Sequence, residues 1–189
     1  TSGADPRQNA QPLVVNHIKG YMALAHNGAL TNARELREEL ELRGSIFHMT
    51  SDSEVISYVI TRERLSSKSI EEAVSRSMDV LKGAYSMVVM SPRKLIAARD
   101  PFGFRPLCMG RIGENVVFAS ESCALDAIGA TFERDIEPGE IVVVDEDALS
   151  KMHSYVELNY GKTWLRPAQE KQRNRKLCRG MHGDCSLYY

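Results

Sequence analysis

The hydrophobic period of the chain changes at Gly83. Before this glycine, apolar residues recur every three or four positions, which is the spacing of amphipathic helices. After it, short runs of β-branched and aromatic residues lie between turn-forming residues, which is the pattern of strands. Helices followed by strands, without regular alternation of the two, predict an α+β fold in which helices cover an antiparallel sheet.

Three helices are expected, each with a local start signal. Asn32 and Glu35 have the spacing of a capping box, and Ser51 and Ser69 each precede a periodic stretch. The helices are expected at Ala33 to Arg43, Ser51 to Arg64 and Ser69 to Gly83. The strands are expected at Tyr85 to Met90, Lys94 to Ala98, Leu107 to Arg111, Asn115 to Ala119 and Glu140 to Val144.

The composition narrows the possible partners. The chain has 189 residues, of which 26% are charged, with a formal net charge of -1. This balance gives no electrostatic reason to expect a nucleic acid or an anionic membrane as partner. No apolar run approaches the roughly 20 residues that span a bilayer. We therefore expect a cytoplasmic protein with one sizeable domain.

Cysteine and histidine spacing predicts neither a metal site nor a disulfide framework. No pair of cysteines has the Cys-x-x-Cys spacing, and the histidines have no metal-ligand spacing. Cys123 stands at the start of a short predicted helix with no neighbouring base, so we expect a small apolar filler rather than a nucleophile. The residues considered are Cys108, Cys123, Cys178, Cys185, His17, His48 and His153.

The last part of the chain differs from the rest. Residues 161–189 are rich in lysine and arginine and have no sustained period, so we place the domain at residues 1–160 and a tail at 161–189. Three interpretations of the tail stay open. It is a disordered solvated end, a basic nucleic-acid-binding tail, or the product of an aberrant junction such as a shifted reading frame.

Three segments carry candidate chemistry. His26-Asn27-Gly28 follows an apolar run, in an expected strand-to-loop position, where an Asn side chain and a Gly N–H can converge on one oxygen; a simple turn is the alternative. Asp52 either caps a helix or holds an ammonium group. Residues 99–107 are expected to form a rigid turn with a buried Arg–Asp pair.

In order along the chain, these segments resemble the glutamine amidotransferases that use an N-terminal cysteine nucleophile. Within that class the chain is most similar to the amidophosphoribosyltransferase family, and asparagine synthetases are the second possibility. The resemblance covers residues 1–154. It rests on the motifs Asn9 to Leu13, Ala23 to Asn32, Ser51 to Val55, Gly83 to Ser86, Arg99 to Leu107, Ser120 to Gly129 and Arg134 to Glu140.

The resemblance implies a fold and a set of site residues. The fold is a four-layer αββα sandwich of the N-terminal-nucleophile hydrolase type, truncated at its N-terminal strands. Asn27 and Gly28 match the oxyanion hole, and Asp52 matches the residue that holds the α-amino group of glutamine. Thr1 and Gly3 fall on a segment that lines the glutamine site. No metal ligand is implied in this chain.

The departures from the family pattern imply an incomplete enzyme. The family's cysteine and carboxylate-binding arginine would precede Thr1, and its phosphoribosyltransferase domain would follow Ser154. We therefore expect this chain alone to be inactive in purine synthesis; a catalytically dead glutamine-binding domain is the alternative. The full enzyme would use glutamine and phosphoribosyl pyrophosphate with Mg²⁺, could carry an iron–sulfur cluster, and would be a homo-oligomer.

Overall fold

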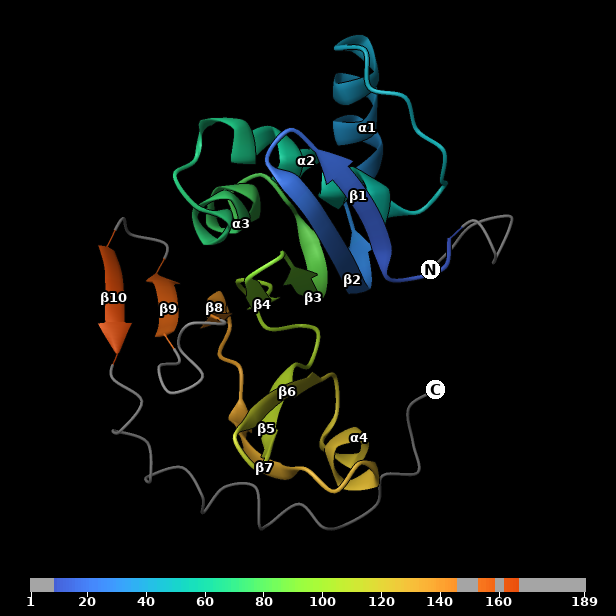
Figure 1. Ribbon diagram of the computed structural model, residues 1–189. Coiled ribbons are helices and arrows are strands. Elements are labelled where there is room, and N and C mark those ends of the chain that lie inside the picture. The colour runs from blue at the N-terminus through green and yellow to red at the C-terminus, as the bar shows by residue number, and fades with distance from the viewer. Residues whose placement is uncertain (1–8, 146–152, 159–161, 167–189) are drawn as a thin grey trace.

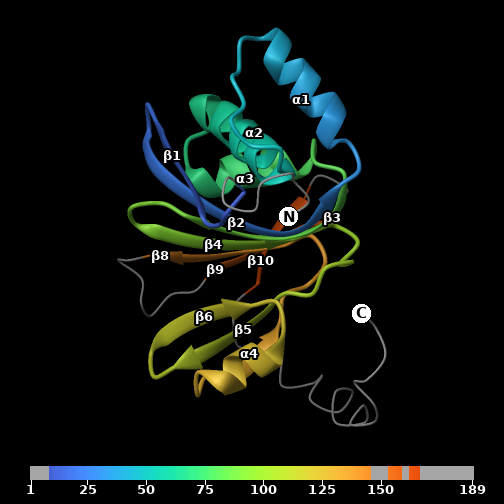
Figure 2. The same cartoon turned by 90° about the vertical axis from the view of Figure 1, so that its right-hand side faces the viewer.

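The structure, a computed structural model, describes residues 9–145, 153–158 and 162–166. In this part of the chain the elements form four layers, seen edge-on in Figure 2: three helices, a larger sheet, a smaller sheet and a short helix. The predicted αββα sandwich is therefore confirmed.

The outer helical layer contains α1 (Ala33–Leu42), α2 (Asp52–Ser66) and α3 (Ile70–Met78) (Figure 1). Two helix starts are confirmed by their caps, because the Ser51 and Ser69 hydroxyls accept hydrogen bonds from backbone N–H groups two and three residues on. The end predicted for α3 was wrong. The helix stops at Met78, and Gly83 instead opens a strand.

The capping box predicted before α1 was also wrong. Asn32 precedes the helix but makes no side-chain cap. Its amide group donates to the Val80 carbonyl at 3.0 Å and accepts from the Lys82 N–H at 3.0 Å. The buried Asn32 side chain therefore ties the start of α1 to the segment that joins α3 to the next strand.

The larger sheet is antiparallel throughout, with the strand order β1-β2-β3-β4-β8-β9-β10. Expected strands 85–90, 94–98 and 140–144 all appear. β2 was anticipated only through the apolar run before His26, and β1, β9 and β10 were missed. β10 falls within the segment treated above as a tail, and residues 167–189 lie outside the described residues. The strands are β1 (Leu13–His17), β2 (Gly20–Leu30), β3 (Gly83–Met90), β4 (Lys94–Arg99), β8 (Glu140–Asp145), β9 (His153–Leu158) and β10 (Lys162–Arg166).

The smaller sheet has the order β6-β5-β7 and is covered on its outer face by α4 (Ser122–Ala127). The strands expected at 107–111 and 115–119 are confirmed as β5 (Cys108–Ile112) and β6 (Asn115–Ala119), and β7 (Thr131–Asp135) was missed. Cys123 is exposed on α4, so its expected role as a small apolar filler was wrong. Leu125 is the α4 residue that is buried.

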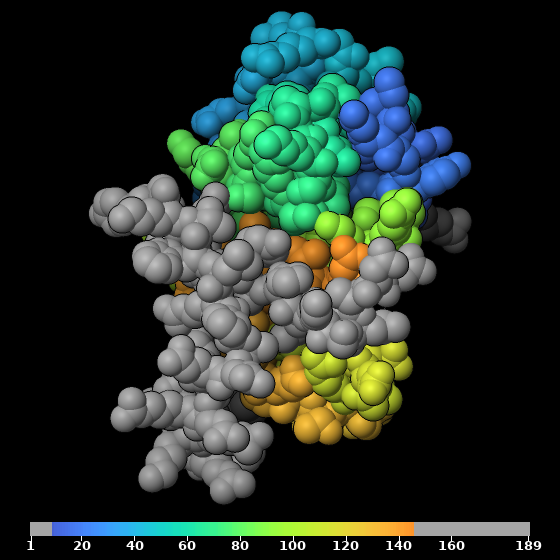
Figure 3. Space-filling view, turned by 60° about the vertical axis from the view of Figure 1, so that its left-hand side comes forward, coloured from blue at the N-terminus to red at the C-terminus, as the bar shows by residue number. Residues whose placement is uncertain are grey.

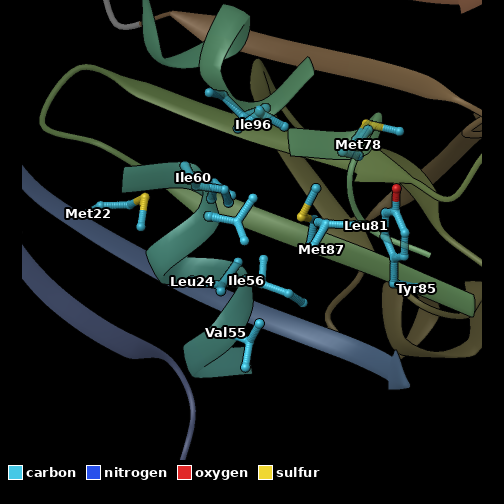
Figure 4. Packing of buried hydrophobic residues seen from close by; sticks show 14 of the residues in the cluster. Met22, Leu24, Val55, Ile56, Ile60, Met78, Leu81, Tyr85, Met87 and Ile96 are labelled. Carbon is cyan, nitrogen blue, oxygen red and sulfur yellow. The ribbon is translucent and has the colours of Figure 1, made fainter. Parts of the chain in front are cut away.

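The hydrophobic core has a separate cluster in each space between layers. Figure 4 shows the largest, where α2 and α3 pack on β2, β3 and β4. Ile56 and Ile60 of α2 contact this cluster with no exposed surface, because the predicted apolar face of the helix points at the sheet. A smaller cluster lies between the two sheets and fixes their spacing; its members are Ala97, Leu107, Met109, Ile136 and Val142.

Candidate functional site

Asn27 and Gly28 lie inside β2, and not in a loop after a strand as the sequence had suggested. They pair with Ser86 and Tyr85 of β3. Gly28 has a φ of +144°, and a Cβ atom there would stand 2.1 Å from the Ala84 carbonyl oxygen. Only glycine fits this close approach of β2 and β3, so Gly28 has a structural reason to be present.

The Asn27 amide is held in one orientation by two partners from distant parts of the chain. Its Oδ1 accepts a hydrogen bond from the Arg105 guanidinium, and its Nδ2 donates to the Ser120 hydroxyl at 3.3 Å. Since the Arg105 guanidinium can only donate, the amide oxygen must face it. The second N–H of the amide is therefore directed by Arg105 and is available to an oxygen of a ligand.

A rigid turn between β4 and β5 positions Arg105. The expected pairing of Arg99 with Asp100 was wrong, because both side chains bind backbone groups instead. The Arg99 guanidinium donates to the carbonyls of Gly103, Arg105 and Ile136 at 2.8, 2.7 and 2.6 Å.

Asp100 holds the same turn from the other side. Its fully buried carboxylate accepts from the N–H groups of Phe102, Phe104 and Arg105 at 3.0, 3.2 and 3.1 Å. Arg105 is thus fixed at both its N–H and its carbonyl. Its side chain can therefore reach Asn27, which lies 78 positions earlier in the sequence.

Asp52, at the first turn of α2, lies beside His26. One carboxylate oxygen accepts from the Leu30 N–H at 3.0 Å, and the other is 3.6 Å from His26 Nδ1. The side chain of Asp52 keeps 18% exposure, so it can be reached by a ligand. Both sequence interpretations of Asp52 survive, because the carboxylate sits at a helix start and also faces outward.

His26 is buried, and burial lowers its pKa, with the nearby Arg105 acting in the same direction. The Asp52 carboxylate opposes this shift but does not reverse it, so the imidazole is neutral at pH 7. Its Nδ1 is 3.3 Å from the Ser53 hydroxyl. Within the described residues its buried Nε2 has no hydrogen-bond partner, a feature that is rare in protein interiors.

Gln11 joins the first described segment to β2. Its side chain accepts from the His26 N–H at 2.5 Å and donates to the His26 carbonyl at 3.0 Å. Sequence reasoning had not singled out Gln11, Ser53, Arg105 or Ser120 individually. All four do fall within motifs of the family resemblance, and that is the signal that could have found them.

A pocket of about 180 Å³ opens between the two sheets beside Asn27. The larger sheet supplies one wall and the smaller sheet with its flanking residues supplies the other, while Asp52 and Gly28 are not among the lining residues. Thr1 and Gly3 lie outside the described residues. The lining residues are Gln11, Ala25, His26, Asn27, Ser86, Met87, Val88, Leu107, Phe118, Ala119 and Ser120.

Neither described cysteine reaches this pocket. Cys108 is buried next to α4, its thiol donates to the Ala119 carbonyl at 3.3 Å, and burial raises its pKa to about 11. Cys123 is exposed, with its sulfur 3.5 Å from a Glu121 carboxylate oxygen. Cys178 and Cys185 lie outside the described residues.

The described residues contain neither a metal-binding cluster nor a membrane-spanning helix. No group of three or more His, Cys, Asp or Glu side chains in this part of the chain is placed to hold a metal ion. No helix within it is long and apolar enough to cross a membrane.

Comparison with known proteins decides the family. A model of the glutamine amidotransferase domain matches residues 1–127. The chain belongs to the glutamine amidotransferase family. The amidotransferase motifs quoted above thus fall largely within the matched region, and Asn27, Gly28 and Asp52 all lie in it.

Similar amidotransferases carry a more specific name. The amidophosphoribosyltransferase of Methanocaldococcus jannaschii is 47% identical over 146 residues, which are 77% of this chain and 31% of that protein. The chloroplastic amidophosphoribosyltransferase 3 of Arabidopsis thaliana is 49% identical over 148 residues, or 78% of this chain and 27% of that one. The chain thus spans about a third of the length of these relatives.

A solved structure of an amidotransferase is also similar to this chain. The glutamine phosphoribosylpyrophosphate amidotransferase of B. subtilis, described as complexed with ADP and GMP, superposes with a TM-score of 0.72 at 41% identity. The match covers 78% of this chain and 31% of that one. The amidotransferase fold and its sequence motifs are therefore shared over the same part of the chain.

Proposed function

We propose that this chain forms part of the glutamine site of an amidophosphoribosyltransferase of purine synthesis. In the complete reaction, ammonia released from the side-chain amide of glutamine replaces the pyrophosphate of phosphoribosyl pyrophosphate and gives 5-phosphoribosylamine. The observation that carries the proposal is the Asn27 amide, which is oriented by Arg105 at the mouth of a pocket between the sheets.

Each proposed residue has a defined task. The Asn27 side chain and the Gly28 N–H stabilise the negative charge that develops on the amide oxygen of glutamine when a thiolate attacks its carbon. Asp52 binds the α-ammonium group, which suits a partly exposed carboxylate with one oxygen already fixed by Leu30. Thr1 and Gly3 are proposed to line the same site.

The attacking thiol is proposed to come from outside the described residues. Cys108 is buried in another layer and Cys123 lies on the outer helix, so neither supplies it. We therefore propose that the described residues alone release no ammonia from glutamine. We propose that Mg²⁺ is bound by the phosphoribosyltransferase domain and that the full-length enzyme could carry an iron–sulfur cluster.

Other features of the full enzyme also remain proposals. They are a phosphoribosyl pyrophosphate site, a homo-oligomeric state and a cytoplasmic location, and the A. thaliana relative named above is chloroplastic. The relatives described above favour this proposal over an asparagine synthetase, because all of them are amidophosphoribosyltransferases.

A chimera tests the proposal directly. The 146 residues of this chain that align with the M. jannaschii enzyme replace the matching segment of that enzyme, and ammonia release from glutamine is measured. We expect turnover in the chimera. Asp52→Asn should raise the KM for glutamine by about 10-fold or more, because a charge-assisted hydrogen bond contributes about 1.5–3 kcal/mol. Asp126→Asn is the matched control, because Asp126 is an exposed carboxylate on α4, and this change should leave the KM for glutamine unchanged.

The alternative function makes a different prediction. The chain is a non-catalytic glutamine-binding domain if two results occur together. The folded chimera releases no ammonia, and calorimetry shows that the original chain binds glutamine whereas its Asp52→Asn variant does not. An Asp52→Asn chimera with unchanged KM would remove the role assigned to Asp52.

A further inference from the structure

A second cavity, of about 440 Å³, lies at the other end of β2. Three segments that are far apart in the sequence form it: the β1–β2 turn, the connection from α2 to α3 and the β3–β4 turn. Figure 3 shows these segments side by side on one face of the molecule. In Figure 2 both turns lie at the left end of the larger sheet, whereas the arrowhead of β2 points to the right.

This cavity is separate from the glutamine site. Gly20 begins β2 at the turn beside the cavity, and Asn27 lies seven positions further along the same strand. At about 3.3 Å per residue the two positions are roughly 23 Å apart. The two sets of lining residues also share no member.

The cavity lining carries five lysine and arginine side chains but only one carboxylate. That carboxylate, Glu71, is already occupied by Lys94 at 2.8 Å, and Lys94 also lies 3.5 Å from Asp145. This group of three charges has a net charge of -1. The four other cations of the lining outnumber it, so the cavity keeps an excess of positive charge.

Among the described residues the four other cations form no ion pair inside the cavity lining, although the charge of Lys68 also acts on Glu72, a carboxylate outside the lining. The Arg64 guanidinium donates to the Ser67 carbonyl at 2.8 Å. Lys19, Lys68 and Arg93 are exposed, and within the described residues no ion pair is formed by their side chains. One of these three comes from each of the three segments, so the positive charge faces the cavity from three sides.

His17 also lines the cavity, and its pKa is affected by the charge there. Partial burial lowers the pKa of His17, and the positive charge of Arg64 lowers it further. A concave surface with uncompensated positive charge concentrates field lines and attracts anions. The volume lies within the range of about 300–1,000 Å³ that is typical of small-molecule sites.

We propose that this cavity binds a small anion that bears two or more phosphate groups. Such an anion presents enough oxygens to contact lysine and arginine side chains from all three segments at once. The proposal does not depend on the function proposed above, because no residue of the glutamine site takes part.

The test is a calorimetric titration of the chain with inorganic pyrophosphate, and with inorganic phosphate for comparison. We expect saturable binding of pyrophosphate with one site per chain, weaker binding of phosphate, and weakening of both by added salt. A variant with Lys19→Gln, Lys68→Gln and Arg93→Gln should bind pyrophosphate at least about 10-fold more weakly, since three charge-assisted contacts are lost.

A charge-matched variant is the control. Arg34→Gln, Arg43→Gln and Lys82→Gln remove three positive charges from exposed positions that do not line the cavity, and should leave binding unchanged. Circular dichroism melts check that both variants fold, and Lys68→Gln alone, with a smaller loss, serves if the triple variant unfolds.

Three results would overturn the proposal. They are no saturable binding of pyrophosphate, equal weakening in the two triple variants, and tight binding of a single-stranded oligonucleotide by a chain that does not bind pyrophosphate. The last result would assign the surface to nucleic acid instead.

Discussion

Removing the Asp100 carboxylate should destabilise the protein more than any exposed charge does. This fully buried side chain accepts three backbone hydrogen bonds, from Phe102, Phe104 and Arg105. In Asp100→Ala all three N–H groups lose their partner. A buried donor left without a partner costs about 1–3 kcal/mol.

The expected magnitude follows from the exposure of the donors. Phe102 and Phe104 have 72% and 69% exposed side chains, so water can reach part of this turn once it relaxes. We therefore expect a loss near the lower end for each bond, about 3–5 kcal/mol in total. Domains of ordinary stability have only about 5–15 kcal/mol available, so Asp100→Ala is expected to leave the protein marginally folded.

Urea unfolding followed by far-ultraviolet circular dichroism measures the effect. Asp126→Ala, which removes an exposed carboxylate from α4, is the control. Asp100→Asn should be intermediate, because its one amide oxygen can still accept bonds from Phe102 and Phe104 while its NH₂ group meets the N–H of Arg105. Loss of less than about 0.5 kcal/mol in Asp100→Ala relative to the control would refute the account of this turn.

Three more predictions concern the candidate site. Gly28→Ala should lower the free energy of unfolding by more than about 3 kcal/mol, measured by thermal or urea unfolding, because the new Cβ meets the Ala84 carbonyl. Gly20→Ala is the control and should lose less, because Gly20 also has a positive φ but its Cβ would have no atom within 4 Å. Equal losses in the two variants would show that φ alone matters. In the chimera described above, Arg105→Lys should lower kcat by about 10-fold or more and leave the KM for glutamine nearly unchanged, since the Asn27 amide loses its fixed orientation. A change confined to KM would contradict the role of Arg105 in positioning Asn27. Burial lowers the pKa of His26, so the stability that the neutral imidazole contributes is present above about pH 6.5 and is lost as the pH falls through the lowered pKa. An NMR titration of the imidazole that gave a pKa at or above about 6.5 would contradict this prediction.

Features set by neighbouring residues could be predicted from the sequence. Ser51 and Ser69 cap helices through atoms two or three positions away, and the face of Val55, Ile56, Val59 and Ile60 follows from helical spacing alone. The strands around β-branched runs were also found. These elements were predictable because their cause lies within the segment itself.

Features set by distant residues could not be predicted in this way. Asn27-Gly28 has the sequence of a turn, yet pairing with Tyr85 and Ser86 holds it in a strand. β7 was missed because its residues are mostly exposed and polar, and its pairing with β5 defines it. The bond from Arg105 to Asn27 spans 78 positions, so no local pattern contains it.

The contact between the two sheets has a consequence for how this protein can vary. Asn27 belongs to the larger sheet, whereas Ser120 directly follows the last strand residue of β6 in the smaller one. The distance between them is set by the volumes of side chains such as Leu107, Met109 and Ile136, which fill the space between the layers. A conservative exchange of Met109 or Ile136, neither of which lines the pocket, could therefore change the geometry of the candidate site from a buried position outside it.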